Sequence, residues 1–207
     1  MNKSGIALEL SVVFFLIMGQ IWIWRDFQYL AIPILLLVFV SWRLRGNNLA
    51  TLGLLGKKSD PATNGSMLMI FIAFWWLIYL IALLVNPNLI GNLVQTDFWL
   101  KYGKKILFYL PWALFQQVCA NGYFANRLKA LTGSSAKTAW GVGLLFAALH
   151  FPNPVLMAVT FIGGALSARF FLKGGSIYYL ALAHAVLAPT VRMFLDYSLR
   201  IGPGFWK

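Results

Sequence analysis

Charged side chains are scarce in this chain, and acidic ones are the scarcest. They make up 11% of the 207 residues, whereas hydrophobic residues make up 60%. This balance excludes an ordinary soluble globular domain. The 17 Lys and Arg outweigh the 5 Asp and Glu, for a net charge of +12. The cations gather at helix ends and in loops, where anionic lipid headgroups hold them. We therefore expect membrane lipids as partners and no nucleic-acid binding.

Cysteine and histidine are almost absent as well. The single cysteine, Cys119, excludes an internal disulfide. His150 and His184 are the only histidines. A zinc site would need both of them together with Cys119, and their spacing gives it no support. We expect no metal and no cofactor.

The chain also lacks the short polar and apolar alternation of outer-membrane strands. It has instead several apolar runs near the ~20 residues that a helix needs to cross the hydrocarbon core. We predict an all-α, polytopic transmembrane bundle, a single membrane-embedded domain over residues 1–207 with interfacial helices. The first apolar run is too long for a signal-peptide core and is expected to be retained. Seven spans are predicted, at 6–24, 29–42, 67–85, 106–128, 138–150, 155–172 and 176–195.

Features between and within these spans carry further expectations. The stretch before Lys105 is mixed in polarity and should skim the membrane surface, as should the apolar piece from Leu49 to Leu55. Gly164 and Ala168 are a small-residue pair suited to close helix packing.

Basic connectors predict the orientation. The connectors at 43–66, 125–138 and 172–175 are basic, so the positive-inside rule places the N-terminus in the cytoplasm and the C-terminus outside. Lys101, Lys104 and Lys105 lie on the other side and oppose this assignment. The expected location is a bacterial inner membrane.

Four polar side chains cluster in the predicted fourth span. Gln117 and Asn121 are four residues apart, and Gln116 and Cys119 are three apart, so in an α-helix they occupy neighbouring faces. Two interpretations remain open. The amides could fix helix packing through hydrogen bonds worth roughly 0.5–2 kcal/mol each. Alternatively, they could form a site with His150 and His184, since histidine suits proton transfer near neutral pH.

The order of these motifs resembles the CAAX protease and bacteriocin-processing (CPBP) family of intramembrane glutamic endopeptidases. The family pattern is Glu-Glu-xxx-Arg-Gly, then Phe-xxx-His, then His-xxx-Asn or Asp. This sequence has Gln116-Gln117-xxx-Asn121-Gly122, Phe146-xxx-His150 and His184-xxx-Ala188. Leu52-Gly53-Leu54 also resembles the family. The likeness implies a core from about 45 to 195, with Gln116, Gln117, Asn121, His150 and His184 at the catalytic positions.

The departures from the pattern bear on activity. In the family, a glutamate and a histidine activate the water that attacks the peptide bond. A glutamine amide has no useful basicity, so ordinary glutamate-dependent hydrolysis should be absent here. The chain would instead bind a membrane peptide, lipid or protein partner in the former substrate cavity, as a pseudoenzyme.

Two alternatives stay open. Cys119, activated by His150 or His184, could serve as the nucleophile of an endopeptidase or acyl-type transferase, with Gln116 or Gln117 as an oxyanion donor. Glu9, the only glutamate, is a remote candidate for rescue. The chain could also be a purely structural subunit of a membrane complex.

Overall fold

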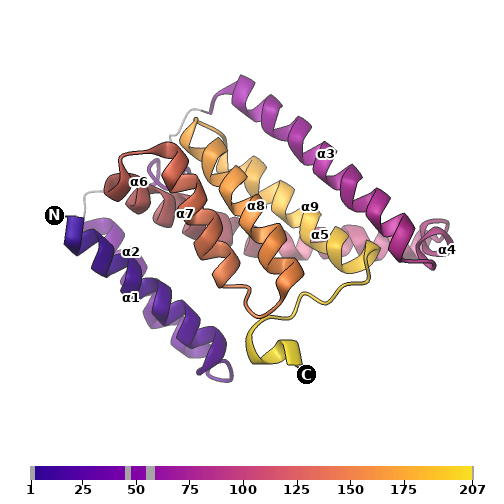
Figure 1. The fold of residues 1–207 in the computed structure, drawn as a ribbon, viewed down its shortest axis with the longest axis horizontal. Helices are drawn as coiled ribbons and strands as arrows, with labels where there is room; N and C mark the ends of the chain where they lie inside the picture. Colours follow the sequence, from indigo (N-terminus) through magenta and orange to yellow (C-terminus); the bar gives the residue numbers. More distant parts are fainter. Residues whose placement is uncertain (1–2, 45–47, 55–58, 207) are drawn as a thin grey trace. The chain divides into compact units, whose positions relative to one another are not determined.

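The computed structural model describes residues 3–44, 48–54 and 59–206, which form helices and turns and contain no β-strand (Figure 1). The predicted all-α fold is confirmed. Short 3₁₀ helices lie at Gln28–Leu30 and Gly202–Trp206, and a π-helix, η2, at Val118–Ala125. The α-helices are α1 (Lys3–Trp22), α2 (Ala31–Leu44), α3 (Pro61–Val85), α4 (Leu89–Leu93), α5 (Thr96–Gln117), α6 (Asn126–Thr132), α7 (Ser135–Ala148), α8 (Pro154–Leu172) and α9 (Ile177–Phe194).

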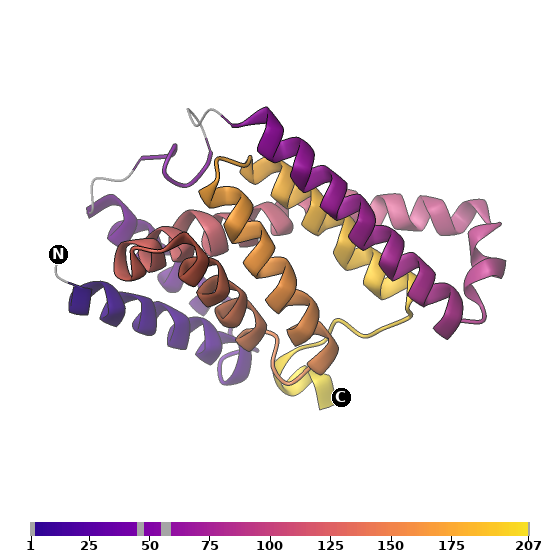
Figure 2. The same cartoon turned by 45° about the horizontal axis from the view of Figure 1, so that its top comes forward.

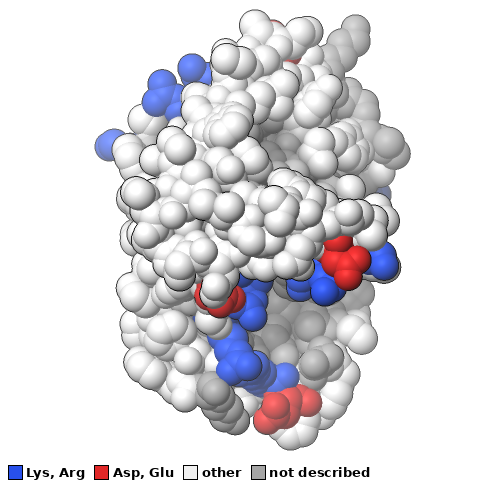
Figure 3. Space-filling model, turned by 90° about the vertical axis from the view of Figure 1, so that its right-hand side faces the viewer, with Lys and Arg blue, Asp and Glu red and all other residues white. Residues whose placement is uncertain are grey.

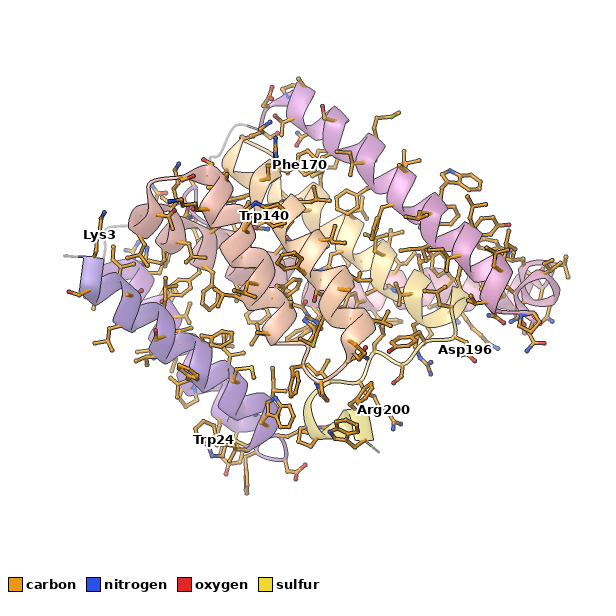
Figure 4. All side chains as sticks on the ribbon, in the orientation of Figure 1. Lys3, Trp24, Trp140, Phe170, Asp196 and Arg200 are labelled. Atoms are coloured by element: carbon orange, nitrogen blue, oxygen red, sulfur yellow. The ribbon has the colours of Figure 1, made fainter. Side chains whose placement is uncertain are left out.

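Among the described helices, α1, α3, α8 and α9 are long and apolar enough to cross a membrane. Lys3 and Trp24 lie near the two ends of α1 (Figure 4), where cations and Trp favour the bilayer interface. Much of the face drawn in Figure 3 carries no charged side chain. α2 and α7 have 14 residues each, about 21 Å, which is short of a hydrocarbon core of about 30 Å. The seven-span assignment therefore stays a prediction at α2, α5 and α7.

The predicted fourth span, 106–128, is wrong as a single α-helix. α5 starts at Thr96 and ends at Gln117, and the chain then continues as η2 and α6. The stretch before Lys105, predicted to skim the surface, contains α4 and the first turns of α5. A π-helix pairs each N–H with the carbonyl five residues back, not four. The α-helical spacing assumed for the polar cluster therefore ends at Gln117.

The chain divides into two compact units. Unit 1 comprises Met1–Lys57, Val118–Leu172 and Arg200–Lys207. Unit 2 comprises Lys58–Gln117 and Lys173–Leu199. The single domain expected over 1–207 stays a prediction.

In unit 1, α7 and α8 pack at the distance that glycine allows. A Cβ on Gly143 would lie 2.6 Å from the carbonyl oxygen of Phe161, and one on Gly164 would lie 3.2 Å from the Gly143 Cα. Gly164 and Ala168 are both buried. The small-residue packing predicted for α8 is thus confirmed.

The connector of unit 1 lies against the π-helix. Its described part, 48–54, forms turns; Arg45, Leu55, Lys57 and Lys58 lie outside the described residues. Asn126 Nδ2 donates to the carbonyl of Thr51 over 2.7 Å. A Cβ on Gly122 would lie 2.9 Å from the Leu52 carbonyl oxygen. The glycine of the first motif and the Leu-Gly-Leu piece therefore meet, and the contact leaves no room for a larger side chain.

Unit 2 contains α3, α4, α5 and α9, and α3 runs alongside α9 in both ribbon views (Figures 1 and 2). The two helices are parallel. At their starts the Ser176 N–H donates to Asn64 Oδ1 over 3.0 Å, and at their ends Asn86 Nδ2 donates to the Phe194 carbonyl over 2.8 Å. α5 runs antiparallel to α9, since its early Tyr102 meets Thr190, with 2.7 Å between the hydroxyl oxygens.

Candidate functional site

The amide pair of the first motif ends α5 in unit 2. Gln117 is buried, and its Nε2 lies 3.3 Å from Nδ1 of His184, a residue in the middle of α9. An amide nitrogen donates, so this contact makes Nδ1 the acceptor and leaves the proton of the neutral imidazole on Nε2. The structure thus brings together the second position of the first motif and the histidine of the third.

Tyr109, also on α5, completes this cluster. Its hydroxyl lies 3.5 Å from His184 Nε2, and the two rings meet edge to face at 5.7 Å. Its hydroxyl also hydrogen-bonds the Gln116 side chain. Gln116 Oε1 is buried and has no hydrogen-bond partner among the described residues. Unit 2 therefore holds a polar cluster of two amides, a phenol and an imidazole, with one unused acceptor.

Asn121 lies in unit 1, on the π-helix, and is fully buried. Its Nδ2 lies 3.4 Å from Ser167 Oγ, and Ser167 in turn donates to the Gly164 carbonyl over 3.0 Å. These contacts hold the π-helix to α8 and agree with the packing interpretation of this amide.

His150 also lies in unit 1, just after α7, and Phe146 holds its ring in two ways. Nδ1 lies 2.7 Å from the Phe146 carbonyl oxygen, and the rings meet edge to face at 5.0 Å. A carbonyl only accepts, so Nδ1 carries the proton and Nε2 of the neutral ring is the basic nitrogen. The Phe-xxx-His spacing therefore fixes the tautomer and orientation of this imidazole.

The two rescue candidates of unit 1 find no support in its geometry. Within the described residues, no hydrogen bond joins Cys119 to His150. Glu9 Oε1 accepts from Tyr123 over 2.7 Å and from Arg127 Nε over 3.0 Å, and Ser41 also donates to it. A carboxylate held by these three donors is a structural group and is not available as a base. Among the described residues, no group of three His, Cys, Asp or Glu could hold a metal ion.

Sequence reasoning missed Tyr109 and Ser167. Each lies outside the family pattern. Tyr109 reaches His184 because α5 packs on α9, and Ser167 reaches Asn121 because α8 packs on the π-helix. A polar side chain on the inward face of an apolar helix was the available signal. Ala188, the last motif position, lies half-buried on α9 and adds no polar group.

The fold and these residues define a helical membrane protein with amides where an intramembrane endopeptidase uses carboxylates. Residues 102–188 match the model of the family described as type II CAAX prenyl endopeptidase Rce1-like. The matched segment contains all five motif positions, and the predicted resemblance is confirmed over it. The chain is therefore a helical membrane protein in which residues 102–188 are similar to that family. No curated protein and no solved structure matches it.

Proposed function

We propose that this protein binds the main chain of a membrane peptide and does not cleave it by glutamate-dependent hydrolysis. The observation that supports this most directly is the unused acceptor, Gln116 Oε1. A buried acceptor without a partner costs about 1–3 kcal/mol. A peptide N–H placed there would recover that cost, and the neighbouring Tyr109 hydroxyl offers a second polar contact to the same peptide.

The chemistry of the cluster favours binding over hydrolysis. Gln116 and Gln117 can donate and accept hydrogen bonds but cannot take a proton from water. His184 is engaged with Gln117 and Tyr109. Neutral groups also avoid the cost of holding a carboxylate in an apolar environment, so the site is suited to an uncharged main chain.

The probe for this proposal is a fluorescent farnesylated peptide ending in a CAAX sequence, chosen from the description of the matched family. Binding to the protein in nanodiscs is measured by anisotropy, and mass spectrometry of the same samples detects cleavage. We expect binding without cleavage. Gln116→Ala should weaken binding about three- to tenfold, the value of one hydrogen bond.

Gln95→Ala is the matched control, because Gln95 is exposed just before α5 in the same unit. It should leave binding unchanged. Cleavage by the wild-type protein, abolished by Gln116→Ala, would overturn the proposal in favour of an active enzyme. Equal binding by wild type and Gln116→Ala would remove Gln116 from the site. Purification that always yields one partner in fixed stoichiometry, with no peptide binding, would favour a structural subunit.

For the location we propose a bacterial inner membrane with a cytoplasmic N-terminus. The basic connectors support this orientation through the positive-inside rule. Alkaline phosphatase fused after Lys207 should be active outside the cytoplasm, whereas a fusion within the connector 59–66 should be inactive. The reverse pattern would contradict the orientation.

A further inference from the structure

The outward face of α5 carries three lysines followed by two aromatic residues. Lys104, Lys105, Phe108 and Trp112 lie three, four, seven and eleven residues after Lys101, which places all five on one stripe of an α-helix. All three lysines are exposed. The Phe108 side chain is 80% exposed and that of Trp112 is 52% exposed. The five side chains of the stripe are therefore exposed together on one side of α5.

The adjoining face of α5 packs inside the unit, since Tyr109 follows Lys105 by four residues. Tyr102 contacts Thr190, and Tyr109 contacts His184, both on α9. Arg192, also on α9, pairs with Asp196 at 3.6 Å. Among the described residues, no ion pair neutralises the three lysines. Their charge is left for a partner outside the chain.

The order of residues along the stripe indicates which partner fits. The lysines occupy the first half of α5, and Trp112 lies about 10 Å further along the axis than Lys105. Trp112 stacks on Phe115 at 5.2 Å, which extends the apolar surface. A phosphate at the lysines and an alkyl chain along the aromatic residues match a phospholipid, whose charged and apolar parts are joined in this order.

We propose that the stripe formed by Lys101, Lys104, Lys105, Phe108 and Trp112 binds an anionic phospholipid. The lysine ammonium groups contact the headgroup phosphate, and the aromatic rings lie along an acyl chain. The site also accounts for three lysines on the side that the positive-inside rule leaves poor in cations. This proposal does not depend on the peptide-binding function.

The test uses the full-length protein in nanodiscs of phosphatidylcholine containing one tenth phosphatidylglycerol. Lipids that remain bound after transfer to detergent are counted by native mass spectrometry. The wild type should retain phosphatidylglycerol in preference to phosphatidylcholine. The triple variant K101Q/K104Q/K105Q should lose at least about tenfold of this preference, since each surface lysine contributes a several-fold factor.

K3Q/K137Q/K173Q is the matched control, because it removes the same charge from three other exposed lysines. It should keep the preference. F108A/W112A leaves the charge intact and should reduce lipid retention, with unfolding temperatures checked for every variant. An equal loss in the control would make the effect one of net charge and overturn the site.

Two further outcomes would also overturn it. Displacement of the lipid by millimolar inorganic phosphate, with no effect of F108A/W112A, would reduce the stripe to a simple anion site. A change in the number of protein copies, with unchanged lipid content, would make the stripe a protein interface.

Discussion

Replacing Arg127 with alanine should lower the free energy of unfolding by about 3–5 kcal/mol, the cost of leaving a buried charge without its partner. Arg127 Nε and Glu9 Oε1 lie 3.0 Å apart, and their side chains are 8% and 12% exposed. Tyr123 and Ser41 would still donate to the Glu9 carboxylate. These two donors offset part of the loss, so we expect a value near the lower end of the range.

The assay is unfolding of the purified protein in mild detergent by titrated SDS, followed by tryptophan fluorescence. Arg192→Ala is the control, because the Arg192–Asp196 pair is 49% and 83% exposed. An exposed pair contributes about 0–1 kcal/mol, so this variant should unfold almost like the wild type. The double variant E9Q/R127M removes both charges, and should recover most of the stability lost by Arg127→Ala.

A loss for Arg127→Ala no larger than that for Arg192→Ala would refute this reasoning. It would mean that water reaches Glu9 in the folded protein. Failure of E9Q/R127M to recover stability would show instead that the contacts of Arg127 with the Tyr123 ring, 5.2 Å from its guanidinium carbon, outweigh its charge.

Three further predictions concern single positions. Cys119→Ser should bind the farnesylated peptide within twofold of the wild type in the anisotropy assay, and cleavage by the wild type that this variant abolishes would support a nucleophilic thiol. Gly122→Ala should destabilise the protein by about 1–3 kcal/mol in the SDS titration, because the new Cβ would meet the backbone of Leu52; an unchanged midpoint would contradict this contact. The pKa of Asp60, at the start of α3, is lowered by hydrogen bonds from the Thr63 side chain, the Thr63 backbone N–H and the Ala62 backbone N–H. Its stabilisation of that helix turn is therefore complete above about pH 3.9 and lost as the pH falls through the lowered pKa. The amide shift of Thr63 should titrate below that pH and should not do so in Asp60→Asn, whereas a midpoint at or above it would contradict the cap.

The long apolar helices could be predicted from sequence because their signal is local. Runs of apolar residues with breaks at Arg25, Asn86 and Lys173 delimit α1, α8 and α9 to within three residues. They also give the end of α3, which begins six residues earlier than predicted. The connector was harder to interpret. Gly122 and Leu52 are seventy residues apart in sequence, so only the folded chain shows that they touch.

The π-helix could not be predicted, since its residues fit an α-helix equally well. Val118–Ala125 contains no proline and no charge that would mark a change of helix type. The widened turn holds Asn121 against Ser167 and Tyr123 against Glu9. Interhelical hydrogen bonds of this kind select a backbone that local sequence does not specify.

Tyr109 shows the same limit at the candidate site. Gln116, Gln117 and His184 could be found by their order and spacing, but Tyr109 has no place in that pattern. It joins them because α5 and α9 run antiparallel, which brings residues 109 and 117 to the two sides of one imidazole. The candidate site thus includes a residue, Tyr109, that the sequence motif does not contain.

The exchange of carboxylates for amides changes what the scaffold must stabilise as well as what it can do. A glutamate at 116 or 117 would place a negative charge beside Tyr109 and His184, where only a protonated His184 could compensate it. Gln116 and Gln117 need only hydrogen-bond partners, and this cluster supplies most of them. Restoring both glutamates should therefore restore hydrolysis only if His184 can hold a proton at the same time. Position 121 also differs, because the family has an arginine there, whereas Asn121 is buried and hydrogen-bonds Ser167. The test is therefore a variant carrying Q116E, Q117E and N121R, assayed by mass spectrometry for cleavage of the farnesylated peptide.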